Sequence, residues 1–481
     1  MSDTAPATER VGIVGYHAYL PAYRLDRGEI AAAAGAMARG TRRVAGYDED
    51  TTTLGVAAAQ PVVTGRETAV GSVWLATTDP VYADKTNATA VHAALDLPPD
   101  IVAADLGASV RSGVVALLAA ARDGGLAVLA DRRGGPAGGT DEREGGDAAA
   151  AFLFGQEAPL AVVTANASVT AEFIDRWRVP GAPDGAAWEE RFGEQRYAEL
   201  AGQLLAALTR AGVDLAGITR FAVAGSNARA VRTVAGTAAK ATGVAHEGGD
   251  LTGLVGNAGA AQAGLALADL LDAASPGDTL LLISLADGAD ALVLRATGAI
   301  TAGRGEPLRA QAGAGVPVGY PQYLLWRGRL AGERARRPEP DRPSAPFAWR
   351  NRAYKLSLTG GRCRKCGAAQ FPLPRVCYQC HAVDEFDPVS AAGQSARIVT
   401  FTVDRLAFSP SPPLISAIIE FERGGRLQCE LTDVRAPLHV GDEVIPVFRR
   451  GATVGGIHNY RWKARPVYRP SEPDAGPERE N

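Results

Sequence analysis

The chain has 481 residues, of which 46% are hydrophobic and 6% are aromatic, and its formal net charge is −3. This composition fits a soluble α/β protein with about two to four domains, and the charge excludes the basic surface that nucleic-acid binding needs. The sequence contains neither a secretory signal pattern nor an apolar run of about eighteen residues. We therefore predict a cytoplasmic protein that does not enter a membrane.

Residues 1–300 contain an internal repeat of strands and helices. In the first copy, strands are predicted over 73–77, 101–104 and 126–130, and helices over 85–94 and from residue 108. In the second copy, strands are predicted over 221–224 and 279–285, and helices over 228–240 and 258–271. Strands that alternate with such helices favour a mixed sheet covered on both faces. Two copies predict a pseudo-two-fold pair of these layers.

The rest of the chain divides at segments rich in glycine, proline and charge. Residues 134–146 are predicted to form a surface loop, and residues 301–345 a linker, because charge and proline gather in its second half without periodicity. Residues 346–390 and 391–468 are predicted to form a zinc ribbon and a small OB-fold β-barrel, with barrel strands over 397–403, 414–421, 427–431 and 443–448. The end of the chain, 469–481, is predicted to be disordered.

All five cysteines lie in the C-terminal part of the chain. Cys363 and Cys366 form one pair and Cys377 and Cys380 a second, each with two residues between the thiols. Two such knuckles predict a tetrahedral Zn²⁺ site, and four thiolates leave no position for a catalytic water, so the zinc is predicted to be structural. Cys429 lies alone in a strand pattern and is predicted to be a small buried side chain.

Two sets of motifs resemble known families. Residues 1–300 resemble the hydroxymethylglutaryl-CoA synthase-like branch of the thiolase superfamily, through 15–21 (GYHAYLP), 47–50 (YDED), 76–78 (ATT) with Lys85, 105–109 (DLGAS), 188–193 (WEERFG) and 255–260 (VGNAGA). The C-terminal part resembles the DUF35 family, through the four paired cysteines and residues 457–463. The resemblance implies an α/β fold: a duplicated, layered αβαβα thiolase-like domain, followed by a rubredoxin-like zinc ribbon and an OB-fold β-barrel.

The catalytic residues of that branch are largely replaced here. The family uses a cysteine nucleophile, a glutamate and a histidine, and the matching positions hold Ser109, Thr78 and Ala224. Asn257 matches the family's active-site asparagine. The resemblance therefore implies thioester chemistry on a scaffold that lacks its usual thiol.

Ser109 and Asn257 each stand at the start of a predicted helix, after a glycine turn. If both helix N-termini point into one cavity, as the resemblance implies, they would stabilise an enolate or oxyanion on a thioester carbonyl. The simpler alternatives stay open. Ser109 can cap its helix, since no adjacent base marks it as a nucleophile, and Asn257 can serve as a turn residue.

Aldol-type chemistry also needs a group that moves a proton. Asp79 is a candidate because it follows a predicted strand, where catalytic groups of layered α/β folds gather. His246 is a second candidate, in a polar turn before Asn257, although a lone histidine is usually an ordinary surface residue. Tyr82 and Tyr320 are weaker candidates.

Arg461 and Lys463 lie among aromatic residues in the predicted barrel. Such a mixture can bind single-stranded nucleic acid, but the net charge argues against it. The resemblance implies instead that the barrel docks on the thiolase-like domain, where these two cations would meet the phosphates of coenzyme A.

Three hypotheses of function follow. The first is an enzyme that uses acyl thioesters of CoA or a carrier protein and makes or breaks a C–C bond by aldol- or Claisen-type chemistry, without a cysteine nucleophile. The second is an acyltransferase that works through an acyl group on Ser109. The third is a scaffold without activity of its own that passes an intermediate to a partner thiolase. The resemblance also implies a homodimer.

Overall fold

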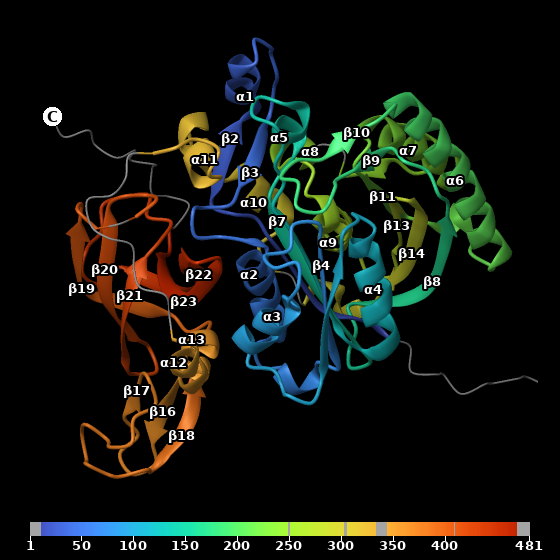
Figure 1. Cartoon of the computed structure of the whole chain (residues 1–481). Helices are drawn as coiled ribbons and strands as arrows, with labels where there is room; N and C mark the ends of the chain where they lie inside the picture. The colour runs from blue at the N-terminus through green and yellow to red at the C-terminus, as the bar shows by residue number, and fades with distance from the viewer. Residues whose placement is uncertain (1–10, 249–250, 303–304, 333–343, 408, 469–481) are drawn as a thin grey trace, which may run out of the picture.

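The computed structural model describes residues 11–248, 251–302, 305–332, 344–407 and 409–468. The predicted disordered tail, 469–481, and residues 333–343 of the predicted linker lie outside the described residues. Figure 1 shows a large layered N-terminal domain with a barrel and a small ribbon domain along one side. Within the described ranges, no helix is long and apolar enough to cross a membrane.

The N-terminal domain is built on ten strands in the order β12-β11-β13-β14-β8-β1-β7-β6-β4-β5. The first half comprises β1 (Gly12–Tyr19), β4 (Ser72–Thr77), β5 (Val102–Gly107), β6 (Leu126–Asp131) and β7 (Ala148–Gly155). The second half comprises β8 (Ala161–Thr170), β11 (Arg220–Gly225), β12 (His246–Glu247), β13 (Thr279–Leu285) and β14 (Gly288–Ala296).

The two halves have the same topology. In the first, β4 is parallel to β5 and β6, and β6, β7 and β1 follow antiparallel. In the second, β11 is parallel to β12 and β13, and β13, β14 and β8 follow antiparallel. The halves meet where β1 pairs with β8. The predicted internal repeat is therefore confirmed, although only β4, β5, β6, β11 and β13 of these ten strands were predicted.

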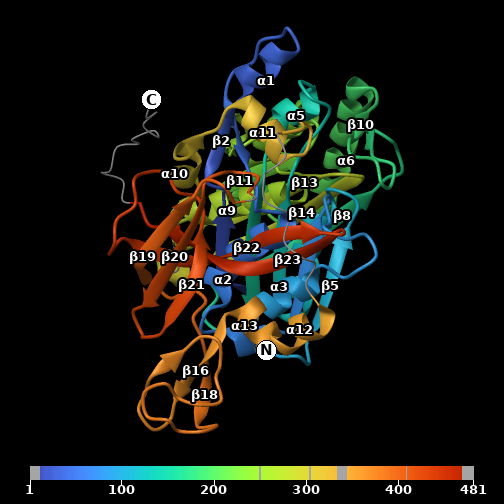
Figure 2. The same cartoon turned by 60° about the vertical axis from the view of Figure 1, so that its left-hand side comes forward.

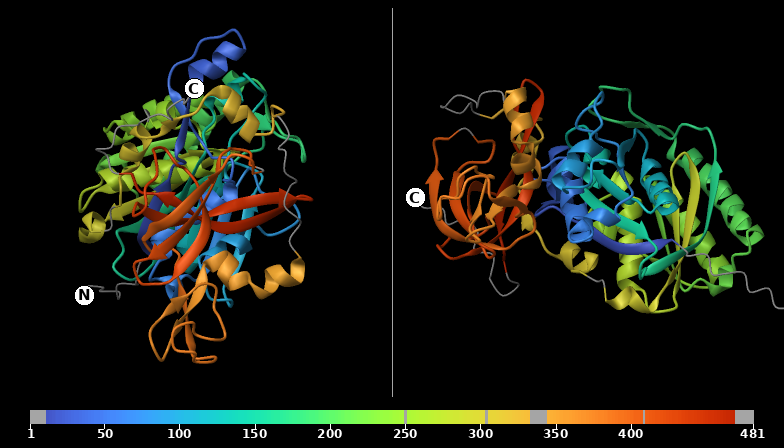
Figure 3. Two further views of the ribbon diagram at one scale, coloured as in Figure 1. Left: turned by 90° about the vertical axis from the view of Figure 1, so that its left-hand side faces the viewer. Right: turned by 90° about the horizontal axis from the view of Figure 1, so that it is seen from below.

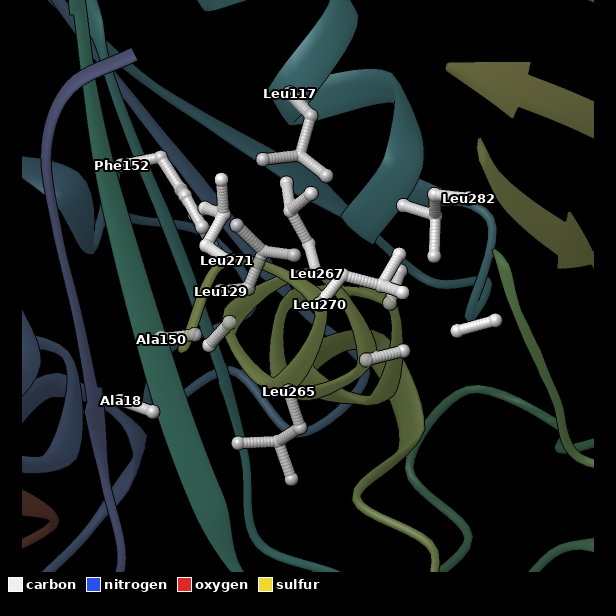
Figure 4. Close-up of a cluster of buried hydrophobic side chains, with 14 of the residues drawn as sticks. Ala18, Leu117, Leu129, Ala150, Phe152, Leu265, Leu267, Leu270, Leu271 and Leu282 are labelled. Atoms are coloured by element: carbon white, nitrogen blue, oxygen red, sulfur yellow. The ribbon is translucent and has the colours of Figure 1, made fainter. Parts of the chain in front are cut away.

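Helices form three layers around these strands. Helix α2 (Thr51–Val63) covers the outer face of the first half, and α6 (Glu190–Arg210) and α7 (Ala228–Thr242) cover that of the second. Helices α4 (Ser112–Asp123) and α9 (Gln262–Ala273) lie between the halves. Leucines of α9 face Phe152 of the first half and Leu282 of the second (Figure 4). A helix that is apolar on all sides belongs in such a central layer, and the αβαβα order is confirmed.

The two central helices begin later than predicted. Ala108 has a φ of 76°, so the turn at 108–111 precedes α4, which starts at Ser112. A 3-10 turn over Gly259–Ala261 likewise precedes α9. The helices touch at their starts, because a Cβ on Gly113 would lie 2.1 Å from the carbonyl oxygen of Ala260. Glycine is therefore required at position 113.

The segment predicted as a linker is partly structured. It contains α10 (Leu308–Gly313) and α11 (Tyr320–Trp326). Tyr320 and Tyr323 are buried against Leu25 and Val44, on strands β2 (Tyr23–Asp26) and β3 (Thr41–Val44). The chain therefore stays on the N-terminal domain to at least Trp326, because aromatic side chains anchor it there.

The C-terminal part forms a ribbon and a closed barrel. Helices α12 (Ala345–Arg350) and α13 (Arg352–Ser357) lead into β16 (Thr359–Cys363), β17 (Ala369–Gln370) and β18 (Phe386–Ser390). The barrel closes in the order β19-β20-β21-β23-β22, from β19 (Ala396–Asp404), β20 (Leu414–Phe421), β21 (Arg426–Leu431), β22 (Glu443–Val454) and β23 (Ile457–Pro466). Figure 2 shows the barrel with the ribbon below it. The predicted OB-fold is confirmed, with β23 as a strand beyond the four predicted.

Candidate active site and metal centre

A cavity of about 400 Å³ lies at the ends of three strands of the N-terminal domain. Thr78 and Asp79 follow β4, Ala108 and Ser109 follow β5, and Asp287 follows β13, and all of them line the cavity. Loops at 132–135 and 175–185 form its other walls. The carboxyl ends of strands in layered α/β folds are where ligands bind, so this cavity is the candidate active site.

Ser109 is held in a hydrogen-bonded turn on the cavity wall. Its Oγ donates a hydrogen bond to the carboxylate of Asp287 and accepts one from the backbone N–H of Arg111, at 3.2 Å. The guanidinium of Arg111 binds both carboxylate oxygens of Asp290, at 2.9 and 3.1 Å. Ser109 is not the N-cap of α4, which is Arg111. In the described part of the chain, no histidine lines this cavity.

Asp79 and Ser109, both predicted from the sequence, line the same cavity. Asp79 accepts a hydrogen bond from Nε of Arg132 at 3.1 Å, and both side chains are about one-third exposed. Thr78, which stands in place of the family's glutamate, donates to Asp131 at 2.8 Å and accepts from Arg133 at 2.8 Å. The hydroxyl of Thr78 is thus occupied by protein partners, whereas the carboxylate of Asp79 is partly exposed and available to a ligand.

Asn257 lies outside the cavity lining. Its Nδ2 donates to the carbonyl of Gly225 at 2.7 Å, and its Oδ1 accepts from the N–H of Gly259 at 3.1 Å. Its backbone N–H donates to the carbonyl of Glu144 at 2.8 Å. Both ends of the amide are thus used to fix the turn before α9. Asn257 therefore serves as a turn residue, the simpler of the two alternatives. We expected it to line one cavity with Ser109, but it is not among the residues that line the cavity.

His246 lies on β12 at the edge of the sheet, also away from the cavity lining. Its Nε2 accepts a hydrogen bond from the backbone N–H of Val223 at 3.1 Å, and burial lowers the pKa of its imidazole. Tyr82 accepts a hydrogen bond from the N–H of His458, and Tyr320 donates one to Glu142 at 2.7 Å. These contacts give all three side chains structural partners.

Sequence reasoning missed Asp287, Asp175 and Tyr197, which line the cavity. Asp287 directly follows an apolar strand and precedes Gly288, a signal of the kind that pointed to Asp79. Burial raises the pKa of Asp175, against a hydrogen bond with Tyr197 that lowers it. No local pattern marks Asp175 or Tyr197, because the first lies in a loop and the second on a helix.

The barrel docks on the N-terminal domain through the acidic loop, residues 47–50. Arg449 of β22 is fully buried and lies 3.0 Å from Glu49, 2.9 Å from Asp433 and 3.7 Å from Asp48. Figure 3 shows the barrel beside α2 and far from α6 and α7. The predicted docking of the barrel thus has a charged, desolvated centre.

Lys463 belongs to the same buried contact. Its ammonium lies 3.0 Å from Asp48 and 2.9 Å from Glu430, and its side chain is 1% exposed. Arg461 is 44% exposed and pairs with Glu430 at 2.7 Å. The prediction that both cations meet CoA phosphates needs an accessible ammonium. The burial of Lys463 removes that role from it, because two carboxylates already neutralise its charge.

The ribbon brings its four paired cysteines together. The sulfur atoms of Cys363, Cys366, Cys377 and Cys380 lie within 4.8 Å of one another. The closest pairs are 3.6 Å and 3.5 Å apart. These spacings suit four thiolates around one ion at a Zn–S distance of about 2.3 Å, so the predicted zinc centre is confirmed. Cys429 is 8% exposed within β21, as predicted.

The fold and these sites define a thiolase-like domain fused to a zinc ribbon and an OB-fold barrel. Residues 350–385 match the rubredoxin-like zinc ribbon domain of ChsH2, and residues 389–449 match its C-terminal OB-fold domain. The DUF35 domain-containing scaffold protein of Methanocaldococcus jannaschii is 31% identical over 126 residues, which cover 25% of this chain and 89% of that protein. The chain therefore belongs to the DUF35 family through its C-terminal part.

The N-terminal part is similar to hydroxymethylglutaryl-CoA synthases. The enzyme of Aeropyrum pernix is 28% identical over 345 residues, which cover 66% of this chain and 94% of that enzyme. A crystal structure of HMG-CoA synthase complexed with CoA superposes with a TM-score of 0.57 at 19% identity, over 65% of this chain and 89% of that one. The N-terminal domain thus has the fold of HMG-CoA synthases and is similar to them in sequence.

Proposed function

We propose that the chain is an enzyme that makes or breaks a C–C bond of an acyl thioester by aldol-type chemistry without a cysteine nucleophile. The observation that carries this proposal is the pairing of Ser109 with Asp287 in a cavity that Asp79 also lines. A carboxylate is a competent base for a substrate hydroxyl, whereas a serine bonded to a carboxylate lacks the imidazole that usually activates it.

In the cleavage direction, Asp287 accepts the proton of a 3-hydroxyl group, directly or through the Ser109 hydroxyl. The C–C bond then breaks, its electron pair forms a thioester enolate, and an aldehyde or ketone leaves. The enolate takes a proton back and becomes a shorter acyl thioester. Cationic side chains of the cavity wall, such as Arg132, lie where they can stabilise the enolate charge. The synthetic direction is the reverse.

The thioester is carried by CoA or by a carrier protein in this proposal. The similarity to a synthase structure complexed with CoA supports CoA as a carrier. Turnover of 3-hydroxyacyl-CoAs, and of acyl-CoAs with aldehydes and ketones, tests the reaction in both directions. We expect Asp287→Asn to lower kcat about 10²- to 10⁴-fold, the range of a lost general base. Asp278→Asn, at the opposite end of β13 and outside the cavity lining, is the matched control. No turnover in either direction would contradict the proposal.

Acylation of Ser109 is the second candidate, favoured by its position after the left-handed residue Ala108 on the cavity wall. Intact-mass spectrometry after incubation with acyl-CoAs separates the two. A stable adduct that Ser109→Ala abolishes favours the acyltransferase. Turnover retained in Ser109→Ala favours the aldol reaction.

We also propose a homodimer that pairs across the edge of the ten-stranded sheet. Strand β5 ends the strand order, and Val102 on it is 61% exposed. An exposed sheet edge is a ready surface for a second copy. Light scattering measures the mass of the particle, and Val102→Lys is expected to shift it from dimer to monomer. A monomeric wild-type protein would exclude this arrangement.

A further inference from the structure

Six arginines line the cavity: Arg132, Arg133, Arg176, Arg178, Arg327 and Arg329. Four of them are bound to a carboxylate at hydrogen-bonding distance, as Arg132 is to Asp79 and Arg176 is to both oxygens of Asp141. The other two, Arg133 and Arg178, are different. They have no carboxylate within hydrogen-bonding distance among the described residues.

Arg133 and Arg178 meet at the end of β4. Nη1 of Arg133 donates to Oγ1 of Thr78 at 2.8 Å, and Nη2 of Arg178 donates to the carbonyl oxygen of the same residue. Two guanidinium groups that bind one residue lie close to each other. Each keeps further N–H donors that these bonds do not use, since a guanidinium carries five.

The carboxylate closest to Arg133 does not neutralise it well. Asp131 lies 3.9 Å from Nη1, and its two oxygens already accept four hydrogen bonds, from Thr77, Thr78 and Ala260. Burial lowers the pKa of Arg133, Asp131 and Asp141 raise it, and the neighbouring Arg176 and Arg178 lower it. An anion that enters the cavity can pair with the partly buried guanidinium of Arg133 and with that of Arg178, which is exposed on the cavity wall.

The position of the pair identifies which anion reaches it. Strands β4 and β5 run parallel with Thr77 opposite Gly107, so Thr78 and Ser109 lie at the same end of adjacent strands. In the proposed reaction, the 3-hydroxyl group lies at Asp287 and Ser109, and its carbon atom is two atoms along the acyl chain from the thioester carbonyl. The phosphates of CoA are separated from that carbonyl by the whole pantetheine arm. An anion at Thr78 therefore belongs to the acyl group.

We infer that Arg133 and Arg178 bind a free carboxylate on the acyl group, so that the substrates are acyl thioesters with a second, ionised end. This inference rests on the proposed thioester function and names its substrate class. Two guanidiniums suit a carboxylate, whose two oxygens can each accept charge-assisted hydrogen bonds. The pair would also fix the direction in which the acyl chain extends from Ser109.

Calorimetric titration of the full chain tests the inference. Malonyl-, succinyl- and glutaryl-CoA are compared with neutral straight-chain acyl-CoAs of matching length. We expect at least one charged ligand to bind about tenfold or more tightly than its neutral match, the range of one charge-assisted hydrogen bond. Arg133→Met and Arg178→Met should each bring this ratio close to one, and Arg178→Lys should restore part of it. Arg329→Met, whose arginine is paired with Asp184, should leave the ratio unchanged.

The outcomes separate the inference from the proposed function. Equal binding of charged and neutral acyl-CoAs by the wild type would overturn the inference and leave the thioester function standing. Binding of no acyl-CoA would overturn both. A third arm uses the 3′-dephospho form of the best ligand. If the arginine variants abolish the contribution of the 3′-phosphate and not that of the acyl carboxylate, the anion is the CoA phosphate and the inference is wrong. Thermal unfolding of each variant confirms that it is folded.

Discussion

Arg449 is the centre of the buried contact between the barrel and the N-terminal domain, and Arg449→Met is expected to weaken that contact strongly. The variant leaves Glu49 and Asp433 without their cation, although both are at most about 3% exposed. Asp48 keeps Lys463 at 3.0 Å. Removing one partner of a buried ion pair costs about 3–5 kcal/mol, because the remaining charge is stranded away from water.

Glu49 sets the pH dependence of this loss. Burial raises the pKa of Glu49 even in the presence of Arg449, and without that cation the pKa rises further. A group with a raised folded-state pKa contributes stability below its unfolded pKa and loses it as pH rises. Neutralising Glu49 by protonation costs about 1.4 kcal/mol for each pH unit above an unfolded pKa near 4.3. The loss should therefore be about 3–5 kcal/mol at pH 8 and smaller at pH 5, where protonation of Glu49 is cheap.

Urea unfolding of wild type and variant at both pH values, followed by circular dichroism and fluorescence, measures this difference. Arg461→Met is the matched control, because Arg461 is 44% exposed and its pair with Glu430 should contribute less than about 1 kcal/mol. Adding Glu49→Gln to Arg449→Met should recover part of the stability at pH 8. An equal loss in the two single variants, or a loss independent of pH, would refute the reasoning.

Three other predictions concern the ribbon, the central helices and the acidic loop. Chelation of the zinc should raise hydrogen exchange in residues 359–390 and leave the ten-stranded sheet protected, whereas global unfolding would contradict a separate ribbon. Gly113→Ala should lower the free energy of unfolding by about 1–3 kcal/mol, because its Cβ meets the Ala260 carbonyl, while Gly202→Ala on open α6 surface should be neutral or stabilising in the same urea assay. Burial tends to raise the pKa of Asp50, but a hydrogen bond with His458 and other contacts outweigh it and lower the pKa below its usual value. The Asp50 carboxylate therefore contributes to the free energy of unfolding above about pH 4, and this contribution is lost in acid. Asp50→Asn should therefore lower the free energy of unfolding at pH 7. Its difference from the wild type should disappear when the same urea assay is repeated well below pH 4.

The parts of the fold that follow from local pattern were predictable. The strand Thr279–Leu285 has the predicted bounds, because a buried strand is an uninterrupted apolar run. The zinc ligands were predictable for a similar reason, because the two cysteines of each pair lie within one turn of the chain and form a local pattern. The start of α4 was not predictable, because the left-handed backbone at Ala108 is imposed by the surrounding turn rather than by alanine itself.

The site depends on contacts between distant parts of the chain, and those left no local signal. Asn257 stands at the predicted turn, but its amide is used by Gly225, 32 residues away. Lys463 looked like a surface cation because the carboxylate that buries it, Asp48, lies at the other end of the sequence. The sequence likewise does not show which cavity arginines have a carboxylate partner, because the folded loops bring those partners together.

The acidic loop connects the fused barrel to the candidate active site. Asp50 accepts hydrogen bonds from Tyr460 of the barrel at 2.9 Å and from the N–H of Thr53 at 3.0 Å, so it also caps helix α2. The next residue, Thr51, donates to the backbone carbonyl of Asp79 at 2.9 Å, on the cavity wall. The barrel thus fixes the start of a helix whose first residue holds Asp79 in place. A chain that carries both domains keeps this wall positioned in every molecule, because docking within one chain does not depend on the concentration of a separate subunit.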